Sequence, residues 1–236
     1  MTSRFEKVAQ KRGLDRPSLI LLILGVLVPL QFFAVVALLV WQRVGGLAWD
    51  EPLLLAIHHT STPQFDTAAI ALTRLGSAWF VLPGVVIAAG LCAFARRWRS
   101  LLYLTLSLGG NALINQAGKA VWHRARPQLW DSAYPLPVDF SFPSGHAMTS
   151  MAVAATLVVL LWHSRWRWIA ITLSTAYVIV VGWTRLYLGV HYPSDIVAGW
   201  MVAIAWSISL CWFIQPGRYL QPSSPPSQSS HLAIKA

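Results

Sequence analysis

Long runs of uncharged, mostly apolar residues alternate along this chain with short segments that hold most of its charged residues. Each run is close to the ~20 residues that an α-helix needs to cross the ~30 Å hydrocarbon core of a bilayer. The runs lack the two-residue alternation of a membrane β-barrel, and lipid offers no partner for an open backbone. The pattern therefore predicts an all-α protein, an integral membrane six-helix bundle. The six runs occupy residues 17–42, 75–95, 100–118, 147–164, 168–184 and 196–217.

The flanks of these runs predict how the chain is organised. The first run follows a basic stretch but is about twice too long for the apolar part of a signal peptide, so we expect a retained helix, bent at Pro29. Residues 44–74 hold two short apolar patches among charged residues, which is typical of one or two interfacial helices. We expect a basic N-terminal segment at 1–16, the six-span domain at 17–217, and a disordered Ser/Pro-rich tail at 218–236.

Composition supports a membrane protein and changes the meaning of the net charge. Hydrophobic residues make up 56% of the chain and charged residues only 11%, less than half of the ~25% typical of soluble domains. A net charge of +10 would suggest nucleic acid in a soluble protein, but here the basic residues cluster between apolar runs, so we expect no nucleic-acid partner. Cys92 and Cys211 lie within apolar runs, and we expect neither a disulfide nor a metal site from them.

Lysines and arginines predict the direction in which the spans run. If the N-terminus is cytoplasmic, two thirds of the 18 basic residues fall on the cytoplasmic side, as the positive-inside rule requires. Both termini are then cytoplasmic, and three of the remaining basic residues belong to the candidate site. The cytoplasmic set comprises Arg4, Lys7, Lys11, Arg12, Arg16, Arg96, Arg97, Arg99, Arg165, Arg167, Arg218 and Lys235.

Three polar segments stand at span ends on the predicted outer side, where ionisable residues suggest function. The first holds Lys119 at the end of the third run and Arg126 followed by Pro127. Seven residues make about two helical turns, so both cations face one way if the helix runs that far, and Pro127 helps to end it. Between them, His123 and Arg124 have a smaller chance of a direct role. A basic residue at a span end is more often only an interfacial anchor.

The second segment opens the fourth run with Pro143, Ser144, Gly145 and His146. Ser144 suits the N-cap position, and the first turn of the helix then offers free N–H groups and the positive end of the helix dipole. Gly145 allows a ligand to approach the backbone. These features predict an anion site at the start of this helix.

The third segment joins the last two runs and contains Thr184, Arg185, His191 and Asp195. His191 and Asp195 are four residues apart, and Pro193 suits the first turn of the last helix. The Asp195 carboxylate can therefore reach a ring nitrogen of His191, fix its tautomer and stabilise its charged form. A lone outer histidine is usually a surface residue, so the hypothesis of a site depends on all three segments meeting.

In order and spacing the three segments resemble the signature of the type 2 phosphatidic acid phosphatase superfamily. That signature is a lysine, six residues and Arg-Pro; then Pro-Ser-Gly-His; then Ser-Arg, five residues, His, three residues and Asp. The match runs from Lys119 to Asp195, and the six-span layout extends it over most of the chain. Thr184 replaces the serine of the pattern; it keeps a hydroxyl, and whether that group still contacts the phosphate region is left open.

The resemblance implies a metal-independent phosphatase that needs no cofactor. His191 would attack phosphorus and form a phosphohistidine, supported by Asp195, while His146 would protonate the leaving group and then activate water. The sequence agrees on the metal, because Asp195 is the signature's only carboxylate and magnesium prefers oxygen ligands. The implied phosphate-binding residues are Lys119, Arg126, Ser144, Gly145 and Arg185, with Thr184 and His123 as further possibilities.

A site at the rim of a bundle suits a lipid phosphate or diphosphate whose tails stay in the bilayer. Members of the family act on undecaprenyl diphosphate, phosphatidylglycerophosphate, phosphatidic acid or lipid A phosphate. Our first hypothesis is recycling of undecaprenyl diphosphate at the outer face of a bacterial inner membrane; the sequence predicts no oligomeric state. Vanadium haloperoxidases and acid phosphatases share the signature but are soluble. A transporter or flippase would favour midplane polar residues and repeated halves, whereas these charges gather at one interface.

Overall fold

The computed structural model describes residues 16–42, 45–132 and 134–216 of the chain. Throughout these ranges the regular secondary structure is helical, which confirms the predicted all-α class. The predicted tail at 218–236 lies outside the described residues, as does the predicted N-terminal segment except for its last residue.

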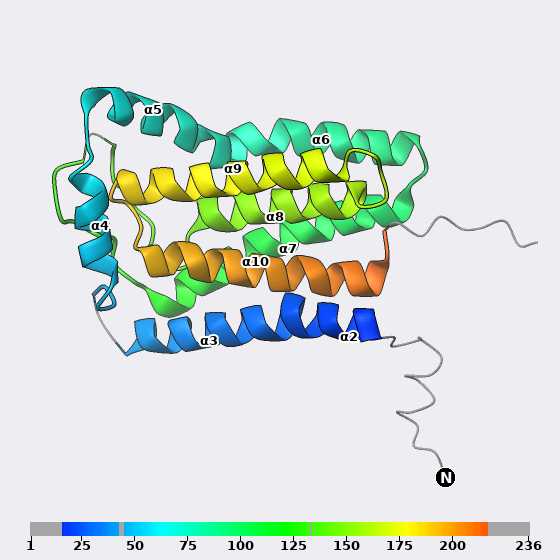
Figure 1. Cartoon of the computed structure of the whole chain (residues 1–236), viewed down its shortest axis with the longest axis horizontal. Helices are drawn as coiled ribbons and strands as arrows, with labels where there is room; N and C mark the ends of the chain where they lie inside the picture. Colours follow the sequence, from blue (N-terminus) through cyan, green and yellow to red (C-terminus); the bar gives the residue numbers. More distant parts are fainter. Residues whose placement is uncertain (1–15, 43–44, 133, 217–236) are drawn as a thin grey trace, which may run out of the picture.

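Long helices run side by side along one axis and form the body of the protein (Figure 1). The predicted runs match them to within four residues at every end. Shorter helices lie near one end of the bundle, where one or two interfacial helices were predicted: α4 (Asp50–His58), α5 (Pro63–Thr73) and the 3-10 turn η2 (Arg74–Gly76). The long elements are α2 (Arg16–Leu22), η1 (Ile23–Leu27), α3 (Val28–Trp41), α6 (Ala78–Phe94), α7 (Trp98–Trp122), α8 (Gly145–Leu161), α9 (Arg167–Tyr187) and α10 (Pro193–Ile214).

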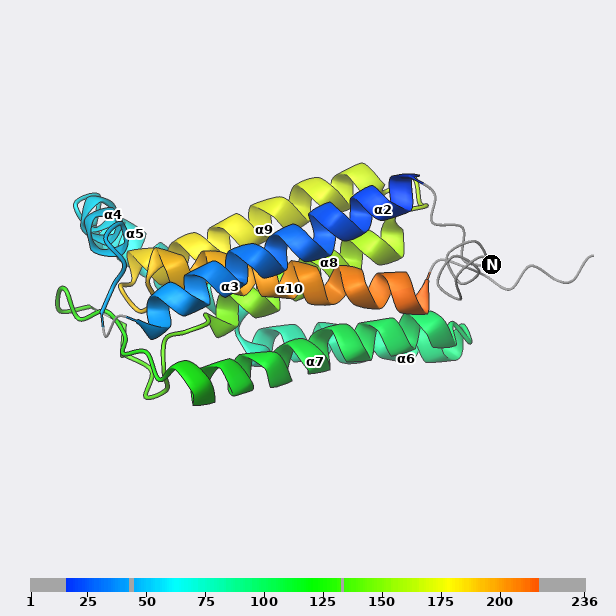
Figure 2. The same cartoon turned by 90° about the horizontal axis from the view of Figure 1, so that it is seen from below.

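Four helical stretches of the described chain are both long and apolar enough to cross a membrane, and they make it a multi-pass membrane protein. They are Leu19–Trp41, Pro63–Phe94, Arg167–Tyr187 and Pro193–Ile214. Helix α8 is apolar but shorter, with 17 residues, and α7 has 25 residues but a more polar sequence. Both nevertheless lie within the same bundle (Figure 2), so the predicted six-helix arrangement is reproduced by the packing.

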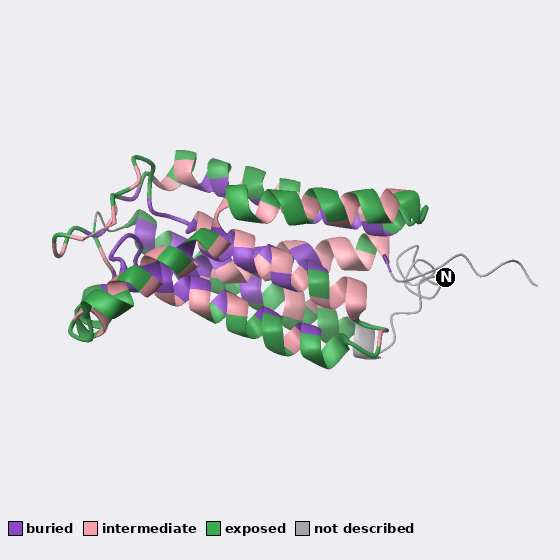
Figure 3. Ribbon diagram, turned by 90° about the horizontal axis from the view of Figure 1, so that it is seen from above, coloured by how far each residue is buried: buried purple, intermediate pink, exposed green. Residues whose placement is uncertain are grey.

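The outer faces of the helices are apolar, as a lipid environment requires. Figure 3 shows exposed residues along the outside of the bundle and buried residues in its interior and at the loops of one end. Helix α6 has no buried side chain, and its Trp79 and Phe94 are 89% and 91% exposed. Lipid tails would cover such a helix.

The first long helix is interrupted where a proline was expected to disturb it. Pro29 has no N–H to give to the carbonyl four residues before it, and the helix opens into the π-helical turn η1 immediately before α3. Proline and π-turns are the usual causes of such local disturbances in long helices.

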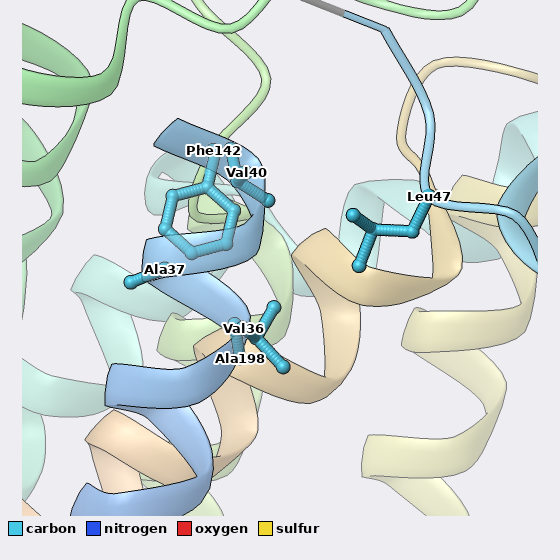
Figure 4. Close-up of a cluster of buried hydrophobic side chains, with 6 residues drawn as sticks. All are labelled: Val36, Ala37, Val40, Leu47, Phe142 and Ala198. Atoms are coloured by element: carbon cyan, nitrogen blue, oxygen red, sulfur yellow. The ribbon is translucent and has the colours of Figure 1, made fainter. Parts of the chain in front are cut away.

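An apolar cluster fixes the loop that leads into α8 (Figure 4). Phe142 is fully buried, and its ring centroid lies 5.4 Å from that of Trp122, whose Nε1 donates a 2.8 Å hydrogen bond to the carbonyl of Ala37. Pro143 follows directly, so the cluster places the first turn of α8 relative to α3. Its buried members are Val36, Ala37, Val40, Leu47, Phe142 and Ala198.

Candidate active site

The three polar segments meet at one end of the bundle, where α7 and α9 finish and α8 and α10 begin (Figure 1). Backbone hydrogen bonds join them: the Ser144 N–H donates to the carbonyl of Asp195 at 3.2 Å, and the Ser141 N–H donates to that of Arg124 at 2.9 Å. Residues far apart in sequence are therefore held in one constellation.

Arg126 lies at the centre of the constellation. Its Nη1 is 3.0 Å from Nε2 of His191 and donates to the carbonyl of Val190 at 2.6 Å. Its Nη2 donates to Oδ1 of Asp139 at 2.6 Å, while the Lys119 ammonium pairs with the other oxygen of the same carboxylate. Two of the predicted phosphate ligands thus share one acidic side chain.

Asp139 is a residue of this site that the sequence analysis missed. Burial alone would raise the pKa of its carboxyl, but hydrogen bonds from Lys119 and Arg126 lower that pKa to about 2. The side chain is 49% exposed, so it reaches the cations from the solvent side. An ionised carboxylate therefore stands between two cations expected to hold phosphate. Its position in an irregular loop, 20 residues after Lys119, gave no signal in the sequence.

His191 is almost fully buried beside this cluster. Its Nε2 faces a donor of Arg126, so we assign the ring proton to Nδ1, which lies 3.4 Å from Oδ2 of Asp195. That contact is short enough for an ion pair but is not aligned as a hydrogen bond. Burial lowers the pKa of His191 most, followed by the charges of Arg126 and Arg185. The imidazole is therefore neutral near pH 7, with an unprotonated nitrogen directed at the cations.

A buried ion-pair network supports Asp195 from the side opposite His191. Nη1 of Arg124 donates to Oδ1 of Asp195 at 2.6 Å, and its Nη2 donates to Oδ2 of Asp50 at 2.8 Å. Both aspartates are fully buried, and the Arg124 side chain is 1% exposed. Neither Arg124 nor Asp50 was predicted for the site: Arg124 stood between the two predicted cations, and Asp50 lay in the segment expected to be interfacial.

The start of α8 has the predicted N-cap. The Ser144 side chain accepts a 3.4 Å hydrogen bond from the N–H of Ala147. A Cβ at position 145 would lie 3.2 Å from Oδ1 of Asn115, whose amide nitrogen donates to the Pro143 carbonyl at 3.0 Å. The first turn of α8, including Gly145, is thereby packed against α7.

His146 lies in that first turn and is covered by η2. A Cβ on Gly76 would come within 3.0 Å of His146 Cδ2 and 2.6 Å of Val181 Cγ1, so only glycine permits this approach. The close contact fixes one side of the His146 ring.

Arg185 is the third predicted cation and is 1% exposed. Its Nη1 donates to Oγ1 of Thr73 at 2.8 Å, its guanidinium lies 5.3 Å from the centre of the Tyr134 ring, and its Nε has no hydrogen-bond partner among the described residues. Thr184 directs its hydroxyl to the carbonyl of Val181 at 2.7 Å, within its own helix.

The first segment differs from the prediction in its backbone. Helix α7 ends at Trp122, and His123 adopts a left-handed conformation with φ of 45°. Arg126 therefore does not share a helical face with Lys119, and Pro127 lies too far along the chain to end the helix. The two cations meet instead through Asp139. His123 is exposed and packs edge-on against Phe140, the residue that follows Asp139.

Comparisons with known proteins agree with this arrangement. Residues 100–218 match the PAP2 superfamily, a range that contains all three segments. An undecaprenyl-diphosphatase of Sulfolobus acidocaldarius is 28% identical over 68% of this chain and 78% of its own length. A decaprenylphosphoryl-5-phosphoribose phosphatase of Mycolicibacterium smegmatis is 32% identical over 64% of this chain and 81% of its own. Neither match supports the transporter alternative.

A solved structure shares the fold over most of the chain. The crystal structure of a transmembrane PAP2-type phosphatidylglycerolphosphate phosphatase from Bacillus subtilis superposes with a TM-score of 0.70 at 26% identity. The similarity covers 82% of this chain and 98% of that one. The shared region therefore includes the bundle as well as the site.

Proposed function

The chain belongs to the PAP2 superfamily and is a membrane lipid phosphatase, and we propose that His191 is the nucleophile with which it removes phosphate. One observation supports this role above all others. His191 is a buried, neutral imidazole with one nitrogen on the cation cluster and the other 3.4 Å from a buried carboxylate. Attack requires a nitrogen with a free lone pair directed at the phosphate, and a negative charge that stabilises the imidazolium as it forms. This geometry supplies both.

Substrate phosphate binds where the Asp139 carboxylate now lies. Phosphoryl transfer depends on neutralising the equatorial oxygens and placing the nucleophile in line with the leaving group. Lys119 and Arg126 exchange their shared carboxylate for phosphate oxygens, and Arg185 offers its buried Nε, which no described residue hydrogen-bonds. The Ser144 hydroxyl and the first-turn N–H groups of α8, including that of Gly145, add donors at the positive end of the helix.

Hydrolysis proceeds in two balanced steps. In the first, Nε2 of His191 bonds to phosphorus and the bond from phosphorus to the leaving oxygen breaks. His146, whose pKa burial and the neighbouring cations lower to about 3, takes up a proton when the phosphate anion offsets those cations, and gives that proton to the leaving oxygen. In the second, a water molecule attacks phosphorus, His146 takes its proton, and the bond between phosphorus and nitrogen breaks. Asp195 stabilises the positive charge that His191 carries between the steps.

We place the site on the periplasmic face of a bacterial inner membrane, with both termini cytoplasmic. Basic residues support this orientation: the connections at the end of the bundle opposite the site are rich in arginine. They include Arg96, Arg97, Arg99, Arg165 and Arg167.

A lipid phosphate or diphosphate is the substrate class that suits a cation cluster at the rim of a membrane bundle. The relatives named above are phosphatases of undecaprenyl diphosphate, decaprenylphosphoryl-5-phosphoribose and phosphatidylglycerolphosphate. Undecaprenyl diphosphate is our first candidate, because an outward-facing site reaches the lipid where its diphosphate is released, and phosphatidylglycerophosphate and phosphatidic acid follow. The cations bind the phosphate alone, so the choice among these lipids depends on the rest of the molecule.

Phosphate release by the purified chain in detergent, measured with each of these lipids, tests the proposal. The His191→Ala variant should lose turnover and also lose the phosphoenzyme trapped by acid quench, with its unfolding temperature unchanged. The His146→Ala variant should lose turnover through slow proton transfer while keeping the nucleophile. Activity near that of the unmodified chain in His191→Ala would remove His191 from the mechanism.

A further inference from the structure

We propose that Asp50 and Arg124 are positioning residues, which hold Asp195 so that it orients and electrostatically supports His191. This proposal rests on the function proposed above for His191. Neither residue belongs to the predicted site, and the guanidinium of Arg124 is directed at two buried carboxylates and away from the cluster around Asp139.

The two oxygens of Asp195 have different partners. Oδ1 accepts a 2.6 Å hydrogen bond from Nη1 of Arg124. Oδ2 accepts a 2.9 Å hydrogen bond from the Tyr192 N–H and lies 3.4 Å from Nδ1 of His191. With Oδ1 held, the carboxylate cannot turn about its last side-chain bond, and Oδ2 stays towards the imidazole. The orientation of the supporting carboxylate therefore depends on Arg124.

Arg124 is itself fixed on several sides. Its Nη1 also donates to the Ser194 hydroxyl at 2.7 Å, its Nη2 donates to Asp50 at 2.8 Å, and its guanidinium lies 4.2 Å from the centre of the Tyr192 ring. A planar guanidinium serves these partners at once, whereas an ammonium is a single point charge. The geometry specifically requires arginine at this position.

Asp50 connects this network to a different part of the chain. It is the first residue of α4, which lies across the end of the bundle (Figure 1), and it accepts from both the N–H and the hydroxyl of Ser194, at 2.9 and 2.6 Å. A third donor is the N–H of Leu47, at 2.8 Å. Helix α4 thereby holds the first turn of α10, from which Asp195 projects.

The charges of the network favour the transition state in particular. Asp50 and Asp195 together outweigh the single charge of Arg124, so the network itself carries a net negative charge on the Asp195 side of His191. The imidazole gains positive charge only as it bonds to phosphorus, and the network stabilises that state more than it stabilises bound phosphate. A role in positioning is thus separable from a role in holding the fold.

Two inorganic anions separate these roles without turnover. Orthovanadate imitates the five-coordinate transition state by bonding to the nucleophile, whereas inorganic phosphate contacts the cations alone. Their dissociation constants are measured by calorimetry on the full chain in detergent, for Arg124→Lys, Asp50→Asn and the milder Ser194→Ala, which keeps every charge. Asp66→Asn is the matched control, because Asp66 is a partly buried carboxylate that pairs with Tyr187 and lies outside the network.

We expect the dissociation constant of vanadate to rise about tenfold or more in Arg124→Lys and Asp50→Asn, as is typical when a group that orients an active residue is lost. Phosphate should bind within about twofold of the unmodified chain, and Ser194→Ala should show the same bias to a smaller degree. With a lipid phosphate substrate, kcat should fall while KM changes little. The Asp66→Asn control should leave all of these unchanged.

Equal weakening of both anions would show that the network only maintains the fold, and unchanged vanadate binding in folded variants would show that it does nothing for His191. Either result overturns the proposal, and Ser194→Ala provides the comparison if the charge variants do not fold. If the unmodified chain binds both anions but hydrolyses no lipid phosphate, the proposed function fails while the anion measurements still decide on the positioning role.

Discussion

Arg124 and Arg126 stand two residues apart on the same irregular segment, and each forms ion pairs, but their surroundings differ. Arg124 pairs with Asp50 and Asp195, neither of which is exposed. Arg126 pairs with Asp139, which is 49% exposed, and touches His191. One arginine is enclosed by carboxylates that cannot leave, and the other holds a carboxylate that solvent or a ligand can replace.

Ion pairing alone therefore does not identify a ligand-binding residue. A buried pair cannot exchange its partner without exposing an uncompensated charge, which costs several kcal/mol. A pair that is open to solvent is worth ~0–1 kcal/mol, so an incoming phosphate displaces it readily. Arg124 is thereby suited to hold the structure of the site, and Arg126 is suited to bind and release an anion.

The largest effect should come from removing the enclosed arginine. Arg124→Ala leaves Asp50 and Asp195 buried without a cation, which should lower the free energy of unfolding by about 3–5 kcal/mol. Arg126→Ala should lower it by less, because its carboxylate partner is half exposed and stays hydrated when the cation is lost. Unfolding of both variants by denaturant in detergent measures the difference, and equal losses would remove the distinction.

At Arg126, the open arginine, a substitution should reduce activity much more than stability. Arg126→Ala removes a donor to the phosphate oxygens, which is worth about 2.7–4 kcal/mol, so kcat/KM should fall a hundredfold or more while the protein stays folded. Arg74→Ala, at an exposed arginine of η2, serves as the control. A loss of less than tenfold in Arg126→Ala would mean that Arg126 does not contact the transferred phosphate.

A smaller effect is expected at the carboxylate that occupies the open site. Asp139→Asn removes the charge that competes with phosphate for Lys119 and Arg126, so the inhibition constant of inorganic phosphate should fall by up to about fivefold. Asp131→Asn, at an exposed aspartate of the same loop, is the control and should leave this inhibition constant unchanged. Weaker inhibition in Asp139→Asn would show that Asp139 assists binding of the anion.

The smallest effect concerns pH. Burial and then the charge of Arg126 lower the pKa of His191 below its ordinary value of 6.5, so the acid limb of the kcat/KM profile should lie below pH 6.5. Protonation of the ring blocks attack, and activity therefore falls as pH drops through this pKa. Residual activity of Arg126→Ala should be lost at a higher pH, because a cation that opposes protonation is gone. If the acid limb of Arg126→Ala lies at the same pH as that of the unmodified chain, Arg126 does not lower the pKa of His191.

Much of the framework was predictable because its causes are local. Apolar runs about as long as the bilayer is thick predicted the six long helices, and the capping chemistry of Ser144 and the fixed φ of Pro193 predicted where α8 and α10 begin. The spacing of His191 and Asp195 placed them close together in advance. These features depend on a few neighbouring residues, which the sequence displays directly.

The parts that escaped prediction depend on contacts between distant segments. Asp50 begins the short helix α4, far along the chain from Arg124, and Asp139 lies in an irregular loop outside any helical register with Arg126, so no spacing related them to their arginines. The end of α7 was misplaced because His123 takes the left-handed conformation without the glycine that usually signals it. Such features follow from the packed fold, which holds a loop against the ends of several helices.

The hydrogen bond from the Ser144 N–H to the Asp195 carbonyl brings the first turns of α8 and α10 together. Each helix start contributes a partial positive charge that belongs to the peptide groups themselves. This share of the attraction for an anion cannot be titrated away in alkali or deleted by exchanging one side chain. In the proposed mechanism the backbone therefore supplies a baseline affinity for phosphate, to which the lysine and the arginines add.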